Sequence, residues 1–171
     1  MKTNRLALGI AVVGLIIAVS QPTTVVAGSI DGDIECTQMT DLIAFVSVET
    51  GYPPLVSCPY VRVASSAGLG LSTKADDDEP MAIYRPSDAA ILLSSQVDTS
   101  HPLGRSYLVH ELVHAHQFNN GMDALAPCPG WLEHQAYRVQ ATYLRDRGLG
   151  EQALDFEILG MLQGACAQDY F

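Results

Sequence analysis

Apolar residues recur every three or four positions in four stretches of the chain, 40–50, 107–117, 131–147 and 151–163. This spacing places the apolar side chains on one side of a helix, so each stretch is predicted to be helical. In the third stretch, the residues expected to face a core are Trp131, Ala136, Val139 and Leu144. In the fourth, they are Leu154, Ile158, Leu159 and Leu162.

Three shorter stretches have the composition or alternation of strands: 60–63, 81–84 and 89–94. The last two flank Arg85-Pro86-Ser87-Asp88, which is typical of a turn. All three precede the helix at 107–117 with little room for long crossovers. We therefore predict an α+β fold, in which a small, mostly antiparallel sheet packs on this helix and on the helix that follows it.

The amino-terminal end has the pattern of a signal peptide. Lys2 and Arg5 precede an apolar run, and small residues near Ala27 suit cleavage. A membrane anchor is the alternative, but the run is short and a polar segment interrupts it. We therefore expect residues 1–27 to be removed, leaving 28–171 as a single domain in the periplasm or outside the cell, with no stable insertion in the membrane.

Charge narrows the possible partners. The formal net charge is −10, and loss of Lys2 and Arg5 with the signal peptide makes it −12. Such acidity argues against nucleic acid and against anionic membrane surfaces as partners.

The mature chain would retain four cysteines, Cys36, Cys58, Cys128 and Cys166. An even number in an exported chain suggests two disulfides, for which three pairings exist. The simplest is Cys36–Cys58 with Cys128–Cys166. Zinc ligation by cysteines is an alternative, but the chain has no C-x-x-C pair.

The helix at 107–117 contains the motif H-E-x-x-H, as His110-Glu111-Leu112-Val113-His114. Residues four apart lie on the same side of a helix, so both imidazoles could bind one divalent metal, usually zinc. Glu111, one position further round, could then reach a water bound to the metal. The alternative is a buried helix that happens to contain histidines.

A catalytic zinc needs a third protein ligand. The extended pattern H-E-x-x-H-x-x-G-x-x-H fails, because Gln117 and Asn120 replace its glycine and its last histidine. Downstream, residues 131–138 are the one cluster of ligand-type side chains near the start of a helix. Over roughly residues 106–140 the sequence resembles the gluzincins, zinc peptidases in which a glutamate on the following helix completes the site.

The resemblance implies that His110 and His114 bind zinc, that Glu133 is the third ligand and that Glu111 is the general base. His134 competes with Glu133, although the two side chains diverge by about 100° round a helix. The thermolysin-like members have an aspartate where this chain has Tyr137, so the groups that orient the ligands must differ.

Several neighbouring residues have weaker indications. Either His134 or Tyr137 could donate a hydrogen bond to an oxyanion that forms during catalysis. Gln117 is expected to have a structural hydrogen-bonding role. We expect His116 to point away from the metal and to be exposed or to support a ligand.

The pattern favours a zinc-dependent hydrolase, and most strongly a peptidase that acts on a peptide or protein substrate. Such a substrate would lie antiparallel to an exposed strand, for which residues 89–94 are the candidate. The alternative is a non-catalytic binding or structural protein in which the metal stabilises a zincin-like fold. Glu111 argues against that alternative, because a structural zinc site needs no base.

Overall fold

The computed structural model describes residues 33–65 and 80–166. The expected signal peptide, residues 1–27, lies outside this part of the chain. The helices and strands, in chain order, are α1 (Thr40–Thr50), β1 (Tyr60–Ala64), β2 (Ala82–Arg85), β3 (Ala90–Ser94), α2 (Pro102–Asn119), α3 (Met122–Leu125), α4 (Pro129–Arg145) and α5 (Gly150–Gly164). Short 3₁₀ turns lie at Cys36–Gln38 and Pro86–Asp88. The protein is therefore an α+β protein, as predicted.

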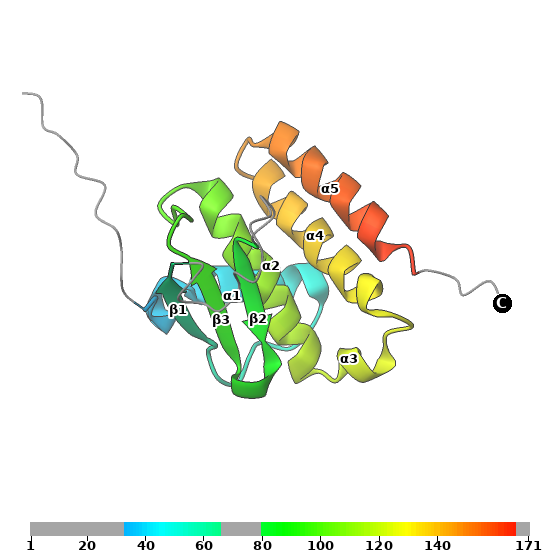
Figure 1. The fold of residues 1–171 in the computed structure, drawn as a ribbon, viewed down its shortest axis with the longest axis horizontal. Coiled ribbons are helices and arrows are strands. Elements are labelled where there is room, and N and C mark those ends of the chain that lie inside the picture. Colours follow the sequence, from blue (N-terminus) through cyan, green and yellow to red (C-terminus); the bar gives the residue numbers. More distant parts are fainter. Residues whose placement is uncertain (1–32, 66–79, 167–171) are drawn as a thin grey trace, which may run out of the picture.

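The three strands form a mixed sheet with the order β1-β3-β2 (Figure 1). β3 pairs parallel with β1 and antiparallel with β2. The prediction of a mostly antiparallel sheet was therefore wrong. The short turn between β2 and β3 makes that pair antiparallel, whereas the chain between Ala64 and Ala82 is long enough to connect opposite edges of the sheet.

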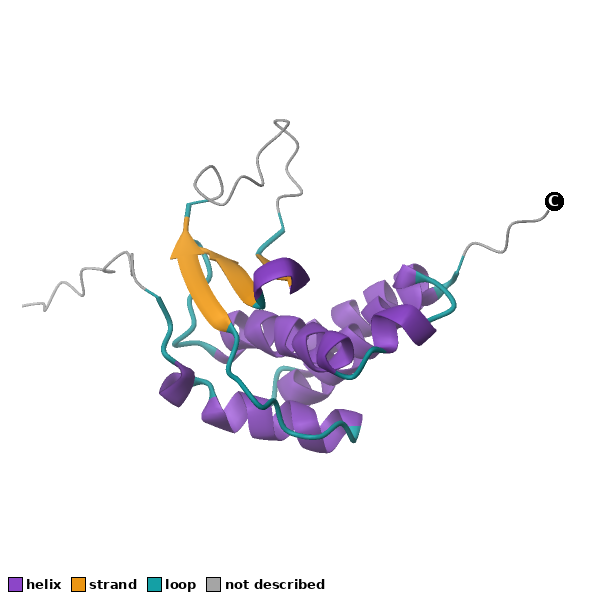
Figure 2. Cartoon of the chain, turned by 90° about the horizontal axis from the view of Figure 1, so that it is seen from below, coloured by secondary structure: helices purple, strands orange, loops and turns teal. Residues whose placement is uncertain are grey.

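Helix α2 is the centre of the molecule. The sheet lies on one side of it and α1 on the other (Figure 2), while α4 packs along a third side and α5 covers α4 (Figure 1). Every residue from Leu108 to Gln117 is buried. The largest fully buried apolar side chains of the core include Met39, Leu42, Ile91, Leu93, Leu112, Tyr143 and Leu144. A helix buried on all sides holds its side chains in fixed directions, which is what a site on α2 requires.

Local chemistry sets the ends of the first two long helices. α1 ends where predicted, because Gly51 takes a left-handed conformation (φ +73°) and its N–H donates to the Ser47 carbonyl. α2 begins at Pro102, five residues before the stretch predicted to be helical. Pro102 suits the first turn of a helix, and the His101 Nδ1 accepts a hydrogen bond from the Leu103 N–H at 3.2 Å.

The predicted inner side of α5 was wrong. Leu154, Ile158 and Leu162 are 54, 43 and 70% exposed, whereas the buried residues of this helix are Ala153 and Gly160. Small residues face α4 because the two helices lie very close, and a Cβ atom on Gly160 would be 2.8 Å from the Tyr137 Cβ. Trp131, also expected in the core, is 37% exposed at the start of α4.

Both disulfides have the simplest of the possible pairings, Cys36–Cys58 and Cys128–Cys166. The first joins the turn before α1 to the segment before β1, and the second joins the start of α4 to the end of α5. Among the helices in the described ranges, none combines the length and the apolar character needed to span a membrane.

Candidate metal centre

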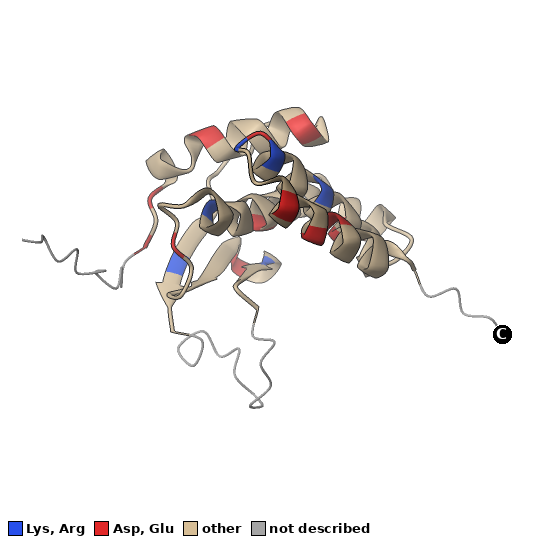
Figure 3. Ribbon diagram, turned by 90° about the horizontal axis from the view of Figure 1, so that it is seen from above, with Lys and Arg blue, Asp and Glu red and all other residues tan. Residues whose placement is uncertain are grey.

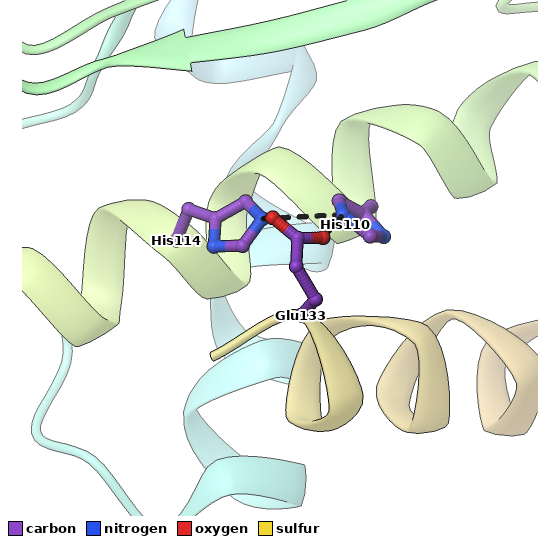
Figure 4. A group of neighbouring side chains, drawn as sticks. All are labelled: His110, His114 and Glu133. Atoms are coloured by element: carbon purple, nitrogen blue, oxygen red, sulfur yellow. Dashed lines mark hydrogen bonds and ion pairs between the residues drawn. The ribbon is translucent and has the colours of Figure 1, made fainter. Parts of the chain in front are cut away.

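His110 and His114 project from successive turns of α2 toward Glu133 on α4 (Figure 4). The two Nε2 atoms are 3.1 Å apart. Glu133 Oε2 lies 3.2 Å from the Nε2 of His110, and Glu133 Oε1 lies 3.4 Å from the Nε2 of His114. The three side chains form the group of potential metal ligands identified in the described part of the chain.

These distances match the requirements of a metal ion. Ligand atoms at about 2.0–2.2 Å from a tetrahedral zinc are themselves separated by about 3.3 Å. The three observed separations, 3.1, 3.2 and 3.4 Å, lie around this value. A position between the two Nε2 atoms and the carboxylate of Glu133 is therefore within reach of all three side chains, so the group could bind a metal ion.

The chain also fixes the tautomer of His110. Gln140 Nε2 donates to the Ser106 hydroxyl at 3.0 Å, and Ser106 donates to the Leu103 carbonyl at 2.7 Å. The Gln140 carbonyl oxygen therefore faces the Nδ1 of His110, 3.0 Å away, and can only accept. Nδ1 consequently carries the proton, and the lone pair of Nε2 is free for a metal.

Gln117 fixes the tautomer of His114 in the same way. Its Nε2 donates to the Leu132 carbonyl at 2.9 Å and to Gln135 Oε1 at 3.0 Å. A backbone carbonyl only accepts, so Gln117 Oε1 must face the Nδ1 of His114, at 2.9 Å. The expected structural role of Gln117 agrees with these bonds. Both histidines are thus oriented by neutral amides rather than by carboxylates.

The charges of the group favour binding of a cation. Burial raises the pKa of Glu133, but hydrogen bonds and charges from His110 and His114 outweigh it and lower the pKa well below its ordinary value. Burial lowers the pKa of His114, but Glu133 and Glu111 outweigh it, so the net shift is upward. Glu133 is therefore ionised, and the buried site attracts positive charge.

Glu111 lies beside the three potential ligands and is 6% exposed. Its Oε2 accepts a hydrogen bond from the Tyr84 backbone N–H at 2.6 Å, which ties the carboxylate to β2. Glu111, His110, His114 and Glu133 all line one cavity of about 360 Å³. Its other walls include residues 80–84, Tyr107, Tyr137, Gln140, Phe156 and Gln163.

The structure distinguishes between Tyr137 and His134, the two residues predicted to donate a hydrogen bond to an oxyanion. Tyr137 lines the cavity, its ring centroid is 4.5 Å from that of His110, and burial together with the charge of Glu133 raises its pKa. It therefore remains protonated and able to donate. His134 instead makes a 3.1 Å contact from its Nδ1 to the Gly160 carbonyl on α5 and does not line this cavity. The geometry thus supports Glu133 over His134 as a ligand and gives His134 no place at the site.

Two further expectations were wrong. His116 is fully buried rather than exposed, and its ring nitrogens have no hydrogen-bond partner at normal distance in the described part of the chain. Its ring therefore forms no hydrogen bond with Gln117 or Gln140, the two glutamines beside the histidines of the site. The strand at 89–94 is not an exposed edge, because β3 is the central strand and all its residues are buried. The edge strand that borders the cavity is β2.

Sequence reasoning missed Gln140, the Tyr84 amide and the cavity wall formed by α5. Gln140 alone left a signal: it stands seven residues after Glu133, two helical turns on and on the same side of α4. The Tyr84 amide and the residues of α5 carry no such signal, because only the packing of the elements brings them to the site.

Fold and site together define an α+β protein with a buried His–His–Glu group that could bind a metal ion. The chain belongs to the family described as a domain of unknown function, DUF6647, which matches residues 33–170. Comparisons with curated protein sequences and with solved structures found no match.

Proposed function

We propose that this protein is a zinc-dependent peptidase with a zincin-like fold that acts outside the cytosol. The observation that carries the proposal is the arrangement of His110, His114 and Glu133 around one position, with the carboxylate of Glu111 in the same cavity. A structural metal site needs no free base beside it. The two disulfides support a location in an oxidising compartment.

Zinc suits this set of ligands, because two imidazoles and a carboxylate leave a fourth, open position. When bound, zinc lowers the pKa of a coordinated water toward about 7 and polarises a carbonyl group. The residues of the chain perform the remaining steps. Gln140 and Gln117 hold the imidazoles in the tautomer that presents Nε2, and Glu133 supplies the negative charge.

Glu111 is the general base in this proposal. It takes a proton from the attacking water and passes it to the leaving amine. The bond from the Tyr84 N–H to Oε2 fixes the carboxylate, which leaves Oε1 for the water. Tyr137, which remains protonated, donates a hydrogen bond to the developing oxyanion.

A peptide would bind along the free edge of β2. This strand borders the cavity, and within residues 33–65 and 80–166 it has a pairing partner on one side only. Main-chain hydrogen bonds to an edge strand hold an extended peptide regardless of its sequence, and the pockets beside the strand select its side chains. The aromatic walls of this cavity, Tyr84, Tyr107, Tyr137 and Phe156, favour an apolar side chain next to the cleaved bond.

The test combines metal content with cleavage of a peptide library by the purified protein. We expect one zinc per chain and cleavage by the wild type. Glu111→Gln should retain the zinc but lower kcat/KM by at least about 100-fold, the usual contribution of a general base. Glu133→Ala should lose the zinc. Wild-type activity in Glu111→Gln would contradict the assigned base, and zinc binding without any cleavage would instead indicate a binding or structural protein.

A further inference from the structure

A second cavity adjoins the candidate metal centre at the start of β2. It has a volume of about 270 Å³ and lies between the segment that follows β3 and the first two turns of α2. Met81 and Tyr107 line both this cavity and the cavity of the metal centre, so the two lie next to each other. The other lining residues of the second cavity, which we call the Asp98 groove, are Gln96, Val97, Asp98, His101, Leu103 and Gly104.

The segment that carries Asp98 is fixed against α2. It can approach this closely because residue 104 is a glycine, where an added Cβ atom would be 1.9 Å from the Asp98 carbonyl oxygen. That carbonyl accepts a hydrogen bond from the His101 N–H at 3.2 Å. The Asp98 Oδ1 accepts from the N–H and the hydroxyl of Ser100, at 2.9 and 2.6 Å. Asp98 therefore has a defined position beside the groove.

Asp98 supplies the negative charge of the groove. Its bonds to Ser100 are the main reason that the pKa of this carboxyl lies below its ordinary value, so it is ionised at neutral pH. Among the ion pairs of the described residues, none includes Asp98. His101 is neutral in this structure, because its Nδ1 accepts from the Leu103 N–H. The positive end of α2 carries about half a unit of charge, less than the carboxylate of Asp98.

The walls of the Asp98 groove combine apolar surface with this charge. Met81, Val97, Leu103 and Tyr107 can pack along an aliphatic chain, and Asp98 can pair with a positive group at its end. Lysine and arginine side chains have this form, an apolar stem with a charged end. The whole chain, with 19 acidic and 9 basic residues, also has acidic positions on helices and loops alike (Figure 3), which attracts cationic peptides.

The position of the groove along β2 decides which part of a peptide it can reach. Cleavage is proposed at the level of Tyr84, whose N–H binds Glu111. In a peptide that pairs antiparallel with β2, the residues after the cleaved bond run from Tyr84 toward Met81 and the Asp98 groove. Met81 precedes Tyr84 by three residues, about 10 Å along a strand. The groove is therefore within reach of the second and third residues after the cleaved bond.

We propose that the Asp98 groove selects a lysine or arginine at the second or third position after the cleaved bond. The inference rests on the proposed function and names the class of substrate, basic peptides. Asp98 is a specificity-determining residue, because it contacts a substrate side chain and not the reacting atoms.

Paired peptides with lysine or norleucine at one position test the proposal, because the two side chains differ mainly in charge. In the wild type, the ratio of kcat/KM for lysine to that for norleucine should be highest at the second or third position after the cleaved bond. Asp98→Asn should lower this ratio about three- to fivefold, the strength of the better exposed ion pairs. The variant keeps the oxygen that accepts from Ser100, so the segment retains its hydrogen bonds.

Asp123→Asn is the matched control. Asp123 is also an exposed aspartate, but it lies on α3, which follows the carboxyl end of α2, whereas Asp98 precedes the amino end. The control should leave the ratio unchanged. Equal ratios in the wild type and in Asp98→Asn would overturn the role of the Asp98 groove but leave the proposed peptidase intact. A preference for lysine before the cleaved bond would likewise overturn it.

Binding separates this proposal from the proposed function. If no peptide is cleaved, the proposed function fails, and fluorescence anisotropy with the lysine peptides decides on the groove. These peptides should bind Glu111→Gln about three- to fivefold more tightly than they bind the double variant Glu111→Gln with Asp98→Asn. Equal affinities for the two variants would overturn the assignment of the Asp98 groove.

Discussion

Gln140 is expected to contribute to metal affinity although it does not touch the metal. Its side-chain oxygen accepts the proton on the Nδ1 of His110, and its amide group is held in turn by Ser106. Gln140→Leu keeps a side chain of similar size at a position that is 1% exposed, but it removes the acceptor. The variant therefore isolates the hydrogen bond from the packing.

The expected effect is a loss of zinc affinity of about 10- to 100-fold, the usual cost of removing the group that orients a metal-binding histidine. This corresponds to about 1.4–2.7 kcal/mol. The loss falls on the metal-bound form, because metal bonding to Nε2 keeps the proton on Nδ1, where it has no acceptor. Without metal, the ring of His110 can change tautomer and relieve part of this penalty.

Competition for zinc with a chromophoric chelator measures the affinity, and thermal unfolding of the metal-free protein measures any loss of stability. Gln152→Leu is the matched control, because Gln152 lies on α5 and does not line the cavity. Gln140→Glu restores an acceptor and should bind zinc at least as tightly as the wild type. If Gln140→Leu unfolded at a lower temperature but bound zinc with unchanged affinity, the assigned role of Gln140 would be wrong.

Two further predictions concern stability. Burial lowers the pKa of His116, an effect that the Pro53 backbone only partly offsets, so below the ordinary value of 6.5 the unfolded chain takes up a proton that the folded chain resists. His116 therefore lowers the free energy of unfolding as the pH falls from 6.5 to 5.5, by at most about 1 kcal/mol. In urea unfolding of the metal-free protein, His116→Leu should show a shallower dependence of this free energy on pH than the wild type. An equal dependence in the two proteins would contradict the role given to His116. Gly130→Ala would place a Cβ atom 2.0 Å from the Gln163 carbonyl oxygen, forcing α4 and α5 apart. Gly130→Ala should lower the free energy of unfolding by about 1–3 kcal/mol, measured by thermal unfolding. Gly150→Ala, whose added Cβ would have no atom within 4 Å, should lower it little. Equal effects of the two substitutions would show that α4 and α5 can move apart without cost.

The group of potential metal ligands could be predicted because two of its three residues lie on one helix. The spacing of His110 and His114 places their rings together wherever α2 lies in the fold. Glu133 followed from the resemblance and from the one downstream cluster of ligand-type residues. The disulfide pairing could also be predicted, because each bond closes a local loop, with separations of 22 and 38 residues.

The groups that orient the ligands depend on how α2 and α4 pack against each other. The spacing of Gln140 from Glu133 places both on one side of α4, but Gln140 can reach His110 only because α2 and α4 pack against each other. The same holds for the Tyr84 amide, which reaches Glu111 because β2 rather than β3 is the edge strand. Strand order depends on the long connection between β1 and β2, and the alternation of apolar residues within a strand does not encode it.

The error on the inner side of α5 has a different cause. A rule that turns the most apolar side of a helix inward selects Leu154, Ile158 and Leu162. The structure instead turns Ala153 and Gly160 toward α4, where only small residues allow the helices to approach this closely. Close packing of one side thus leaves the large apolar residues on the other, where exposure to water is unfavourable.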